Sequence, residues 1–348
     1  MAKLTYLGIR GTSLDWFKSY LTGRKQFVCY NNNISETQEI TCGVPQGSVL
    51  GPLLFIIYTN DLPMAIKSNC IFFADDTTLY SHSNNLTELF KTLENDLIQL
   101  TDWFKVNKLS LNLTKTNFVL FSKKTNFVTD LTLNVDNTKI NRVSCVKFLG
   151  ILIDENLNWH EQILHCKKKI SSGVYAMNTL KQNLNTDHLK TLYYSLIHSY
   201  LSYGNILWGT ARKLHVHKLE ILQKRAVRII SKAKYNAHTC PIFKSLHIPQ
   251  LIDIHNIQLC KMMFQYTNNM LPSPIMQVFV SNSTIHDHNT RNRNVPHMEC
   301  VHFSQTANSF LHKAPQLWGK LPQHLKNITT ENTFNHKIKN YYIHENQV

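Results

Sequence analysis

Two adjacent carboxylates, Asp75 and Asp76, lie between apolar residues 71–74 and 79–80. Unpaired carboxylates are costly to bury, and consecutive residues of a strand point to opposite faces of a sheet. The tip of a hairpin would instead display both side chains at the edge of a groove, where Mg²⁺ takes one or two carboxylates together with substrate phosphates. The pair therefore predicts a divalent-metal site, and a plain Asp-Asp turn between two strands is the alternative.

A loop rich in glycine and proline, residues 43–52, precedes the carboxylates and reads Gly-Val-Pro-Gln-Gly-Ser-Val-Leu-Gly-Pro. Glycine lets a backbone approach a ligand closely, and proline stiffens the chain. Gln46 adds a hydrogen-bond donor and an acceptor near the apex of the loop. The composition indicates a loop that contacts a ligand, with an ordinary strand-to-helix connection as the alternative.

Other motifs narrow the classes of chemistry. The sequence has no GxGxxG and no GxxxxGK[ST] pattern, which excludes the common dinucleotide fingerprint and the P-loop. His160 and His165 are one residue too far apart for an HExxH zinc motif, and no second pair of ligands follows at zinc-finger spacing. The 8 cysteines include no CxxC pair, which favours reduced thiols and an intracellular protein, nuclear or cytoplasmic.

The elements that would position these residues alternate irregularly between strands and helices in residues 1–160. Residues 69–79 predict a hairpin centred on the two aspartates, and residues 86–106 predict a long amphipathic helix. Further strands are predicted at residues 117–121 and 146–153, and helical patterns dominate after them. The pattern predicts an α+β fold and argues against a regular βαβ architecture.

Charge is unevenly distributed along the 348 residues. The chain holds 37 Lys+Arg and 22 Asp+Glu, a net charge of +15, and residues 161–348 carry +14 of it. A neutral half followed by a basic half indicates a segment that binds a polyanion. No stretch approaches the roughly 18 apolar residues of a spanning helix, and the first residues lack the apolar core of a signal peptide, so no membrane partner is expected.

A basic helix is predicted at residues 218–232. At about 100° per residue, its apolar side chains share one arc and its cations share the neighbouring arc. Such cations would contact nucleic-acid phosphates in a salt-dependent and sequence-independent manner, although a solvated basic face fits the spacing equally well. The predicted duplex-binding residues are Lys218, Lys224, Arg225, Arg228 and Lys232.

In their order and spacing, the glycine-rich loop and the aspartate pair resemble the reverse-transcriptase family, above all non-LTR (LINE-type) retrotransposons of the jockey and CR1 kind. The resemblance rests on residues 43–63 and 73–80. It covers nearly the whole chain, because other segments are also similar to such elements. These segments are residues 8–11, 16–28, 109–122, 146–159, 207–230 and 288–310.

The resemblance implies a right-hand polymerase that copies an RNA template from a DNA primer, using dNTPs and Mg²⁺. It implies a partial palm over residues 1–160 (an antiparallel sheet with packed helices), a basic helical thumb over residues 161–240, and a C-terminal region of helices and loops over residues 241–348. The implied site residues are Asp75 as a metal ligand with Asp76 as its less direct partner, Gln46 and Gly47 at the template and nucleotide, Lys115 near the nucleotide's phosphates, and Phe148, Leu149 and Gly150 at the turn that grips the primer end.

One departure from the family bears on activity. The family's palm carries a first catalytic aspartate on the strand before residues 8–11, and the acids that precede Asp75 here lie in other contexts: Asp15, Glu36, Glu39 and Asp61. We therefore expect an N-terminally truncated polymerase that is inactive alone, because two-metal chemistry needs both cations held in register. The alternatives are a non-catalytic palm–thumb relic that binds RNA or DNA, and an enzyme assembled in trans. The oligomeric state is left open.

Overall fold

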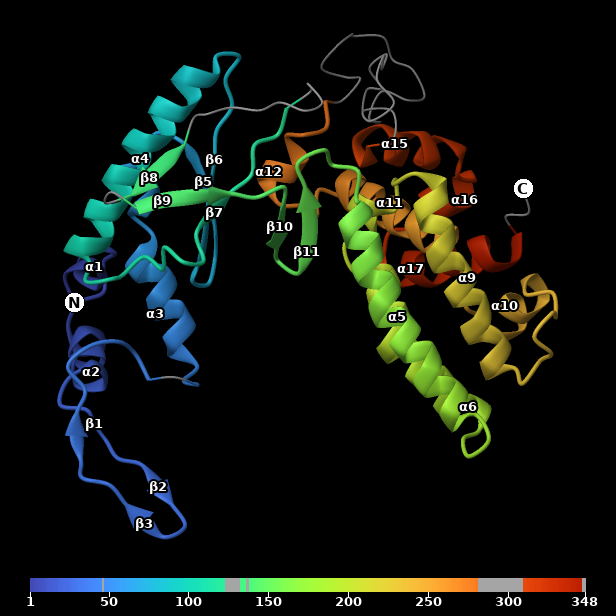
Figure 1. The fold of residues 1–348 in the computed structure, drawn as a ribbon, viewed down its shortest axis with the longest axis horizontal. Coiled ribbons are helices and arrows are strands. Elements are labelled where there is room, and N and C mark those ends of the chain that lie inside the picture. Colours follow the sequence, from blue (N-terminus) through green and yellow to red (C-terminus); the bar gives the residue numbers. More distant parts are fainter. Residues whose placement is uncertain (46, 123–131, 136–137, 281–308, 346–348) are drawn as a thin grey trace. The chain divides into compact units, whose positions relative to one another are not determined.

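The computed structural model describes residues 1–45, 47–122, 132–135, 138–280 and 309–345. It divides the chain into two compact units: unit 1 is Met1–Phe118 with Lys124–Val143, and unit 2 is Val119–Lys123 with Ser144–Val348. Both helices and strands are present, which confirms the α+β class (Figure 1). The division between the units falls at residues 143–144, because the hairpin over residues 145–154 packs on the helix that follows it.

Unit 1 begins with two short helices and a narrow antiparallel ribbon. In the ribbon β2 (Cys29–Tyr30) pairs with β3 (Asn33–Ile34), and β1 (Lys25–Gln26) pairs with β4 (Gln38–Glu39). Asn31 and Asn32 form the turn with φ values of 47° and 63°, a left-handed conformation that asparagine tolerates better than most residues. The two helices are α1 (Ala2–Tyr6) and α2 (Thr12–Leu21).

The centre of unit 1 is a hairpin followed by a long helix. The elements are α3 (Leu50–Thr59), the 3₁₀ helix η1 (Leu62–Ala65), β5 (Asn69–Phe73), β6 (Asp76–Tyr80) and α4 (Leu86–Val106). Helix α4 has the predicted bounds, and the Asn85 side chain caps it by accepting hydrogen bonds from the N–H groups of Thr87 and Glu88. Phe90, Leu97 and Leu100 of the predicted apolar face are buried.

A three-stranded sheet in unit 1 packs against α4. Its strands are β7 (Asn117–Phe118), β8 (Leu133–Val135) and β9 (Thr138–Arg142), with β9 in the middle. Strand β7 runs parallel to β9, and β8 runs antiparallel to it. Leu133, Val135 and Ile140 are buried. The strand predicted at residues 117–121 is therefore present but ends at Phe118.

Unit 2 opens with a second hairpin, β10 (Cys145–Phe148) and β11 (Ile151–Asp154). The prediction of one strand over residues 146–153 is wrong, because Leu149 and Gly150 adopt φ values of 46° and 85° and reverse the chain. The carboxylate of Asp154 then accepts hydrogen bonds from the N–H groups of Asn158 and Trp159, which leads the chain into the next helix.

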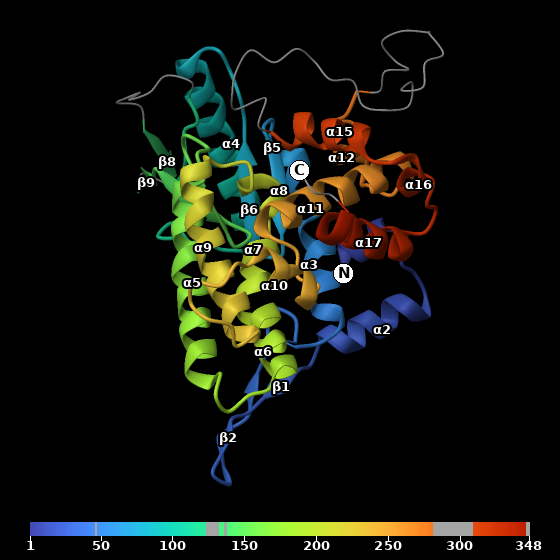
Figure 2. The same ribbon diagram turned by 90° about the vertical axis from the view of Figure 1, so that its right-hand side faces the viewer.

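The rest of unit 2 is helical, as predicted. Helices α5 and α9 lie side by side and share one buried core, which includes Ile170, Leu219 and Ala226 (Figures 1 and 2). A second core joins α11, α15 and α17, where the Phe264 and Phe334 rings stack with centroids 4.4 Å apart. The elements are α5 (His160–Leu180), α6 (Thr186–Tyr193), the π-helix η2 (Tyr194–His198), α7 (Ser199–Ser202), α8 (Asn205–Trp208), α9 (Lys213–Ile230), α10 (Cys240–Leu246), α11 (Leu251–Thr267), α12 (Ser273–Met276), α15 (Phe310–Lys320), α16 (Gln323–Lys326), α17 (Glu331–Asn340) and the π-helix η3 (Tyr341–Glu345).

Within the described ranges, no helix combines the length and the apolar character that a membrane span requires. The segment at residues 288–310, which is similar to LINE-type retrotransposons, lies almost entirely outside the described residues.

Candidate functional site

Asp75 and Asp76 lie at the turn of the β5–β6 hairpin. Phe73 pairs with Asp76, so Ala74 and Asp75 form a two-residue turn and Asp76 is the first residue of β6. Ala74 has a φ of 53°, a conformation that costs a residue with a Cβ on the order of 1 kcal/mol. Both carboxylates are exposed. The hairpin therefore displays them together at its tip, as the sequence predicts.

The start of this hairpin is fixed to α4 by one buried carboxylate. Asp96 is only 1% exposed, and its two oxygens accept hydrogen bonds of 2.9 Å from the N–H groups of Lys67 and Ser68, directly before β5. Burial by itself raises the pKa of Asp96, but the hydrogen bonds at Ser68 and Lys67 and the Lys67 charge outweigh it and hold this pKa below its usual value. Asp96 thus positions the element that carries Asp75.

We expect Asp96→Ala to lower the free energy of unfolding of unit 1 by about 2 kcal/mol, because two backbone donors lose their acceptor. The pKa of Asp96 is lower in the folded state than in the unfolded chain, so its contribution is present at neutral pH and is lost as the pH falls below about 4. Faster amide hydrogen exchange at Lys67 and Ser68 is the measurement. Asp102→Ala, at an exposed position of the same helix, is the control. Equal exchange in both variants would contradict the role of Asp96.

The glycine- and proline-rich loop is held by its own serine. Ser48 Oγ donates a hydrogen bond of 2.8 Å to the Pro45 carbonyl and accepts one of 3.0 Å from the Gly51 N–H. A Cβ at buried Gly51 would lie 3.0 Å from Ser48 Oγ and 3.3 Å from the Pro45 carbonyl oxygen, so a larger residue would press against the atoms that hold this loop. Gly47 has a φ of 78°. Gln46 lies outside the described residues, and its predicted role is untested.

Lys115 lies in a turn between α4 and β7 and is exposed. Its N–H donates to the Asn112 carbonyl at 3.1 Å, and its carbonyl accepts from Asn117 Nδ2 at 3.2 Å. These two bonds fix the backbone at Lys115 within unit 1.

Phe148, Leu149 and Gly150 belong to unit 2, where they form the β10–β11 turn. The Tyr203 hydroxyl donates a hydrogen bond to the Leu149 carbonyl, and Gly150 lies against the Tyr203 ring. On the other side, the Leu152 N–H donates to Gln162 Oε1 of α5 at 3.0 Å. The turn is therefore attached to the helices of unit 2, a long-range contact that no local pattern in the sequence indicates.

We expect Tyr203→Phe to loosen this turn without unfolding unit 2, since one hydrogen bond of about 1 kcal/mol is lost and the ring remains. Amide exchange at Gly150 should accelerate about five-fold, the value that corresponds to this free energy. Exchange in the interior of α5 should be unchanged, as should exchange at Gly150 in Tyr6→Phe, whose tyrosine is exposed in unit 1. No change at Gly150 in Tyr203→Phe would show that the hydroxyl does not hold the turn.

The basic helix is α9, but it does not reach Lys232. Helix α9 ends at Ile230, and Lys232 adopts a φ of 53° in a C-terminal turn. The Ala233 N–H donates to the Arg228 carbonyl and the Lys232 N–H donates to the Ile229 carbonyl, the two bonds of a Schellman motif. Arg228 is also partly engaged, because its Nε donates to the Ala237 carbonyl at 2.9 Å. Lys218, Lys224 and Arg225 lie on α9 as predicted.

Asp75 and Asp76 are the candidate metal ligands in the described part of the chain. No group of three or more His, Cys, Asp or Glu side chains is close enough there to hold a metal ion. Two neighbouring exposed carboxylates fit Mg²⁺, which retains water and takes substrate phosphates as its remaining ligands. Asp75 and Asp76 could therefore take part in a metal site whose other ligands come from elsewhere.

Residues 1–153 match the family described as reverse transcriptase (RNA-dependent DNA polymerase). The probable RNA-directed DNA polymerase from transposon X-element of Drosophila melanogaster is 25% identical over 244 residues, 68% of this chain and 27% of that protein. The probable RNA-directed DNA polymerase from transposon BS of the same species is 31% identical over 245 residues, 66% of this chain and 27% of that protein.

The RNA-directed DNA polymerase from mobile element jockey of Drosophila melanogaster is 28% identical over 247 residues, 68% of this chain and 27% of that protein. The chain thus spans about a quarter of the length of the curated relatives that it matches. These similarities confirm the resemblance that the loop and the aspartate pair indicate.

Proposed function

Because residues 1–153 belong to the reverse-transcriptase family of LINE-type retrotransposons, we propose that the chain supplies part of a site for RNA-directed DNA synthesis. The observation that carries the proposal is the exposed Asp75–Asp76 pair at the tip of a hairpin whose start is hydrogen-bonded to Asp96 of α4. In this proposal residues 1–160 are part of a palm, residues 161–240 form a thumb, and residues 241–348 form a C-terminal region.

Asp75 and Asp76 would hold Mg²⁺, Asp75 as the direct ligand. When bound, Mg²⁺ supplies charge stabilisation for the attacking and leaving oxygens of nucleotidyl transfer. The protein's part is to keep the two carboxylates in place. The β5–β6 ladder and the anchor at Asp96 support that role, because a displacement of about 1 Å can cost about 100-fold in rate.

The remaining site residues would bind the substrates. Lys115 would neutralise phosphates of the incoming dNTP, and the loop with Gln46 and Gly47 would contact the template and the nucleotide. The turn of Phe148, Leu149 and Gly150 would hold the primer end, a role that its attachment to Tyr203 supports. The primer–template would lie on the cations Lys218, Lys224, Arg225, Arg228 and Lys232.

We also propose that these 348 residues do not polymerise alone. The acids before Asp75 are Asp15, Glu36, Glu39 and Asp61, none of them in the family's first catalytic position. The second candidate function, a non-catalytic module that binds RNA or DNA, is favoured by this observation.

Primer extension on an RNA template with Mg²⁺ and dNTPs tests the proposal. The chain alone should give no detectable product. A fusion that adds an aspartate-bearing palm strand and fingers ahead of Met1 should extend the primer. Extension by the chain alone would show that its own acids complete the site, and an inactive but folded fusion that binds primer–template would favour the non-catalytic module.

A further inference from the structure

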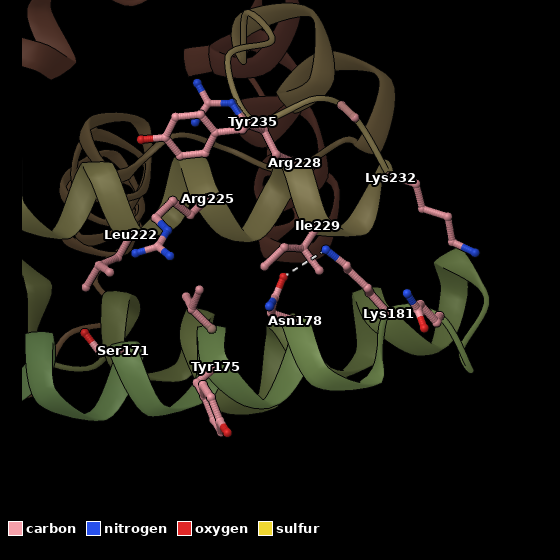
Figure 3. Close-up of a pocket in the computed structure, with 13 residues that line it drawn as sticks. Ser171, Tyr175, Asn178, Lys181, Leu222, Arg225, Arg228, Ile229, Lys232 and Tyr235 are labelled. Atoms are coloured by element: carbon pink, nitrogen blue, oxygen red, sulfur yellow. Dashed lines mark hydrogen bonds between the residues drawn. The ribbon is translucent and has the colours of Figure 1, made fainter.

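A groove of about 680 Å³ lies between α5 and α9, inside unit 2 (Figure 3). Val174 of α5 and Leu222 and Ile229 of α9 give it an apolar lining. The volume is within the roughly 300–1,000 Å³ of sites that take small ligands. A nucleic-acid duplex is a rigid rod with its phosphates on the outside. It is too wide to enter a groove of this size and could touch only the rim of the groove.

The charged side chains of the groove are all basic. They are Lys181, Arg225, Arg228 and Lys232, and none of the described residues that line the groove is acidic. Lys181 Nζ donates to Asn178 Oδ1 at 3.1 Å, and Arg228 Nε is bound to the Ala237 carbonyl. Arg225 and Lys232 are exposed, and in the described part of the chain their side chains make no hydrogen bond or ion pair. The groove thus presents two cations that are available to an anion.

Two exposed tyrosines also line the groove. Tyr175 is 74% exposed and Tyr235 is 85% exposed. In Figure 3, Arg225 reaches into the space between the helices, whereas Tyr175 projects from the side of α5 that faces away from α9. Exposed aromatic rings beside a basic groove are the combination that binds single strands, since phosphates follow the cations and unpaired bases stack on the rings.

We propose that this groove binds single-stranded nucleic acid, with phosphates on Arg225 and Lys232 and with a base stacked on Tyr175 where the strand leaves the groove and passes over the outer side of α5. The inference rests on the proposed function and refines it. Three of the five predicted duplex-binding residues, Arg225, Arg228 and Lys232, line the groove and are assigned to an unpaired strand. Lys218 and Lys224 are not among its lining residues and are left for the duplex.

The test compares two charge reversals in the full-length chain. Arg225→Glu with Lys232→Glu removes the groove cations, and Lys167→Glu with Lys169→Glu makes the same change of charge at exposed positions of α5 outside the groove. The probes are a short fluorescent oligothymidylate strand and a blunt duplex of equal length. At about 0.1 M salt, the groove pair should lower affinity for the single strand about 100-fold, two phosphate contacts being lost. The control pair should change it less than about three-fold.

A separate variant tests stacking. Tyr175→Ala should weaken binding of the single strand at least about five-fold, and Tyr175→Phe should restore it, since stacking on a ring contributes about 1–3 kcal/mol per base. Equal losses in the two charge-reversed pairs, or a loss for the duplex as large as that for the single strand, would overturn the groove assignment while leaving the proposed function in place. Failure of the unaltered chain to bind either probe would overturn both.

Discussion

Primer extension by the fusion that carries the added palm strand and fingers is expected to fall at least about 100-fold when Asp75 is replaced by alanine. Asp75 lies in the turn itself, and its loss removes the direct ligand of the proposed metal site. Misplacement of the attacking hydroxyl by about 1 Å is enough for an effect of this size. Product formed per unit time, with primer–template in excess, is the quantity to measure.

Asp76→Ala should lower extension less than Asp75→Ala, because Asp76 is the less direct partner in the proposal. Asp102→Ala changes an exposed aspartate of α4 and should leave extension unaltered. Binding of primer–template should be similar in all three variants, which separates a loss of chemistry from a loss of substrate. Full extension by Asp75→Ala would rule out its role as a metal ligand.

Affinity of the chain for a primer–template with a single-stranded template overhang should fall on the order of 10²–10³-fold between about 50 and 200 mM salt. This estimate follows if each of the five predicted cations neutralises one phosphate and releases its counterion, with Lys218 and Lys224 on the duplex and the three groove cations on the unpaired strand. The uneven charge, +14 of the +15 in residues 161–348, supports the placement of the contacts in unit 2. A fluorescence anisotropy titration at several salt concentrations gives the slope.

Lys218→Glu with Lys224→Glu should reduce duplex affinity about 100-fold at about 0.1 M salt. The slope of log affinity against log salt concentration should become shallower by the amount that two phosphate contacts contribute. The pair Lys167→Glu with Lys169→Glu is again the matched control, with the same change of charge on exposed side chains. A slope that is the same in all three proteins would show that these lysines do not contact phosphates.

Secondary structure is predicted best from the sequence where the residues that determine an element lie within that element. The apolar spacing of α4 predicts a helix over Leu86–Val106, the bounds that the structure has. The β5–β6 hairpin is predicted equally well, because two apolar runs flank a polar pair. In both cases the side chains that determine the element are its own.

Two predictions fail at a residue other than glycine that takes a left-handed conformation. Leu149 and Lys232 both have positive φ values, and each reverses or ends an element that its local composition would continue. For the first reversal the signals were Gly150 itself and the turn that the family resemblance implies at residues 148–150. For the end of α9 no glycine is present, so the Schellman turn could not be read from the sequence.

Local sequence patterns also fail to indicate the hydrogen bonds that fix the site elements in place. Asp96 binds the N–H groups of Lys67 and Ser68, 29 and 28 residues away, and Tyr203 binds Leu149 across 54 residues. Such pairs depend on the packing of whole elements. The division between the two compact units depends on such packing as well, because the attachment of β10–β11 to α5 is a tertiary contact.

Mn²⁺ binding to the β5–β6 turn tests the central claim most directly. Mn²⁺ can replace Mg²⁺ at oxygen ligands, and as a paramagnetic ion it broadens nearby amide signals even when binding is weak. In the chain labelled with ¹⁵N at alanine, the Ala74 amide signal should broaden first, and Asp75→Ala with Asp76→Ala should abolish the effect. An Ala74 signal that is unaffected by Mn²⁺, or one that broadens equally in the double variant, would contradict a metal site at these aspartates.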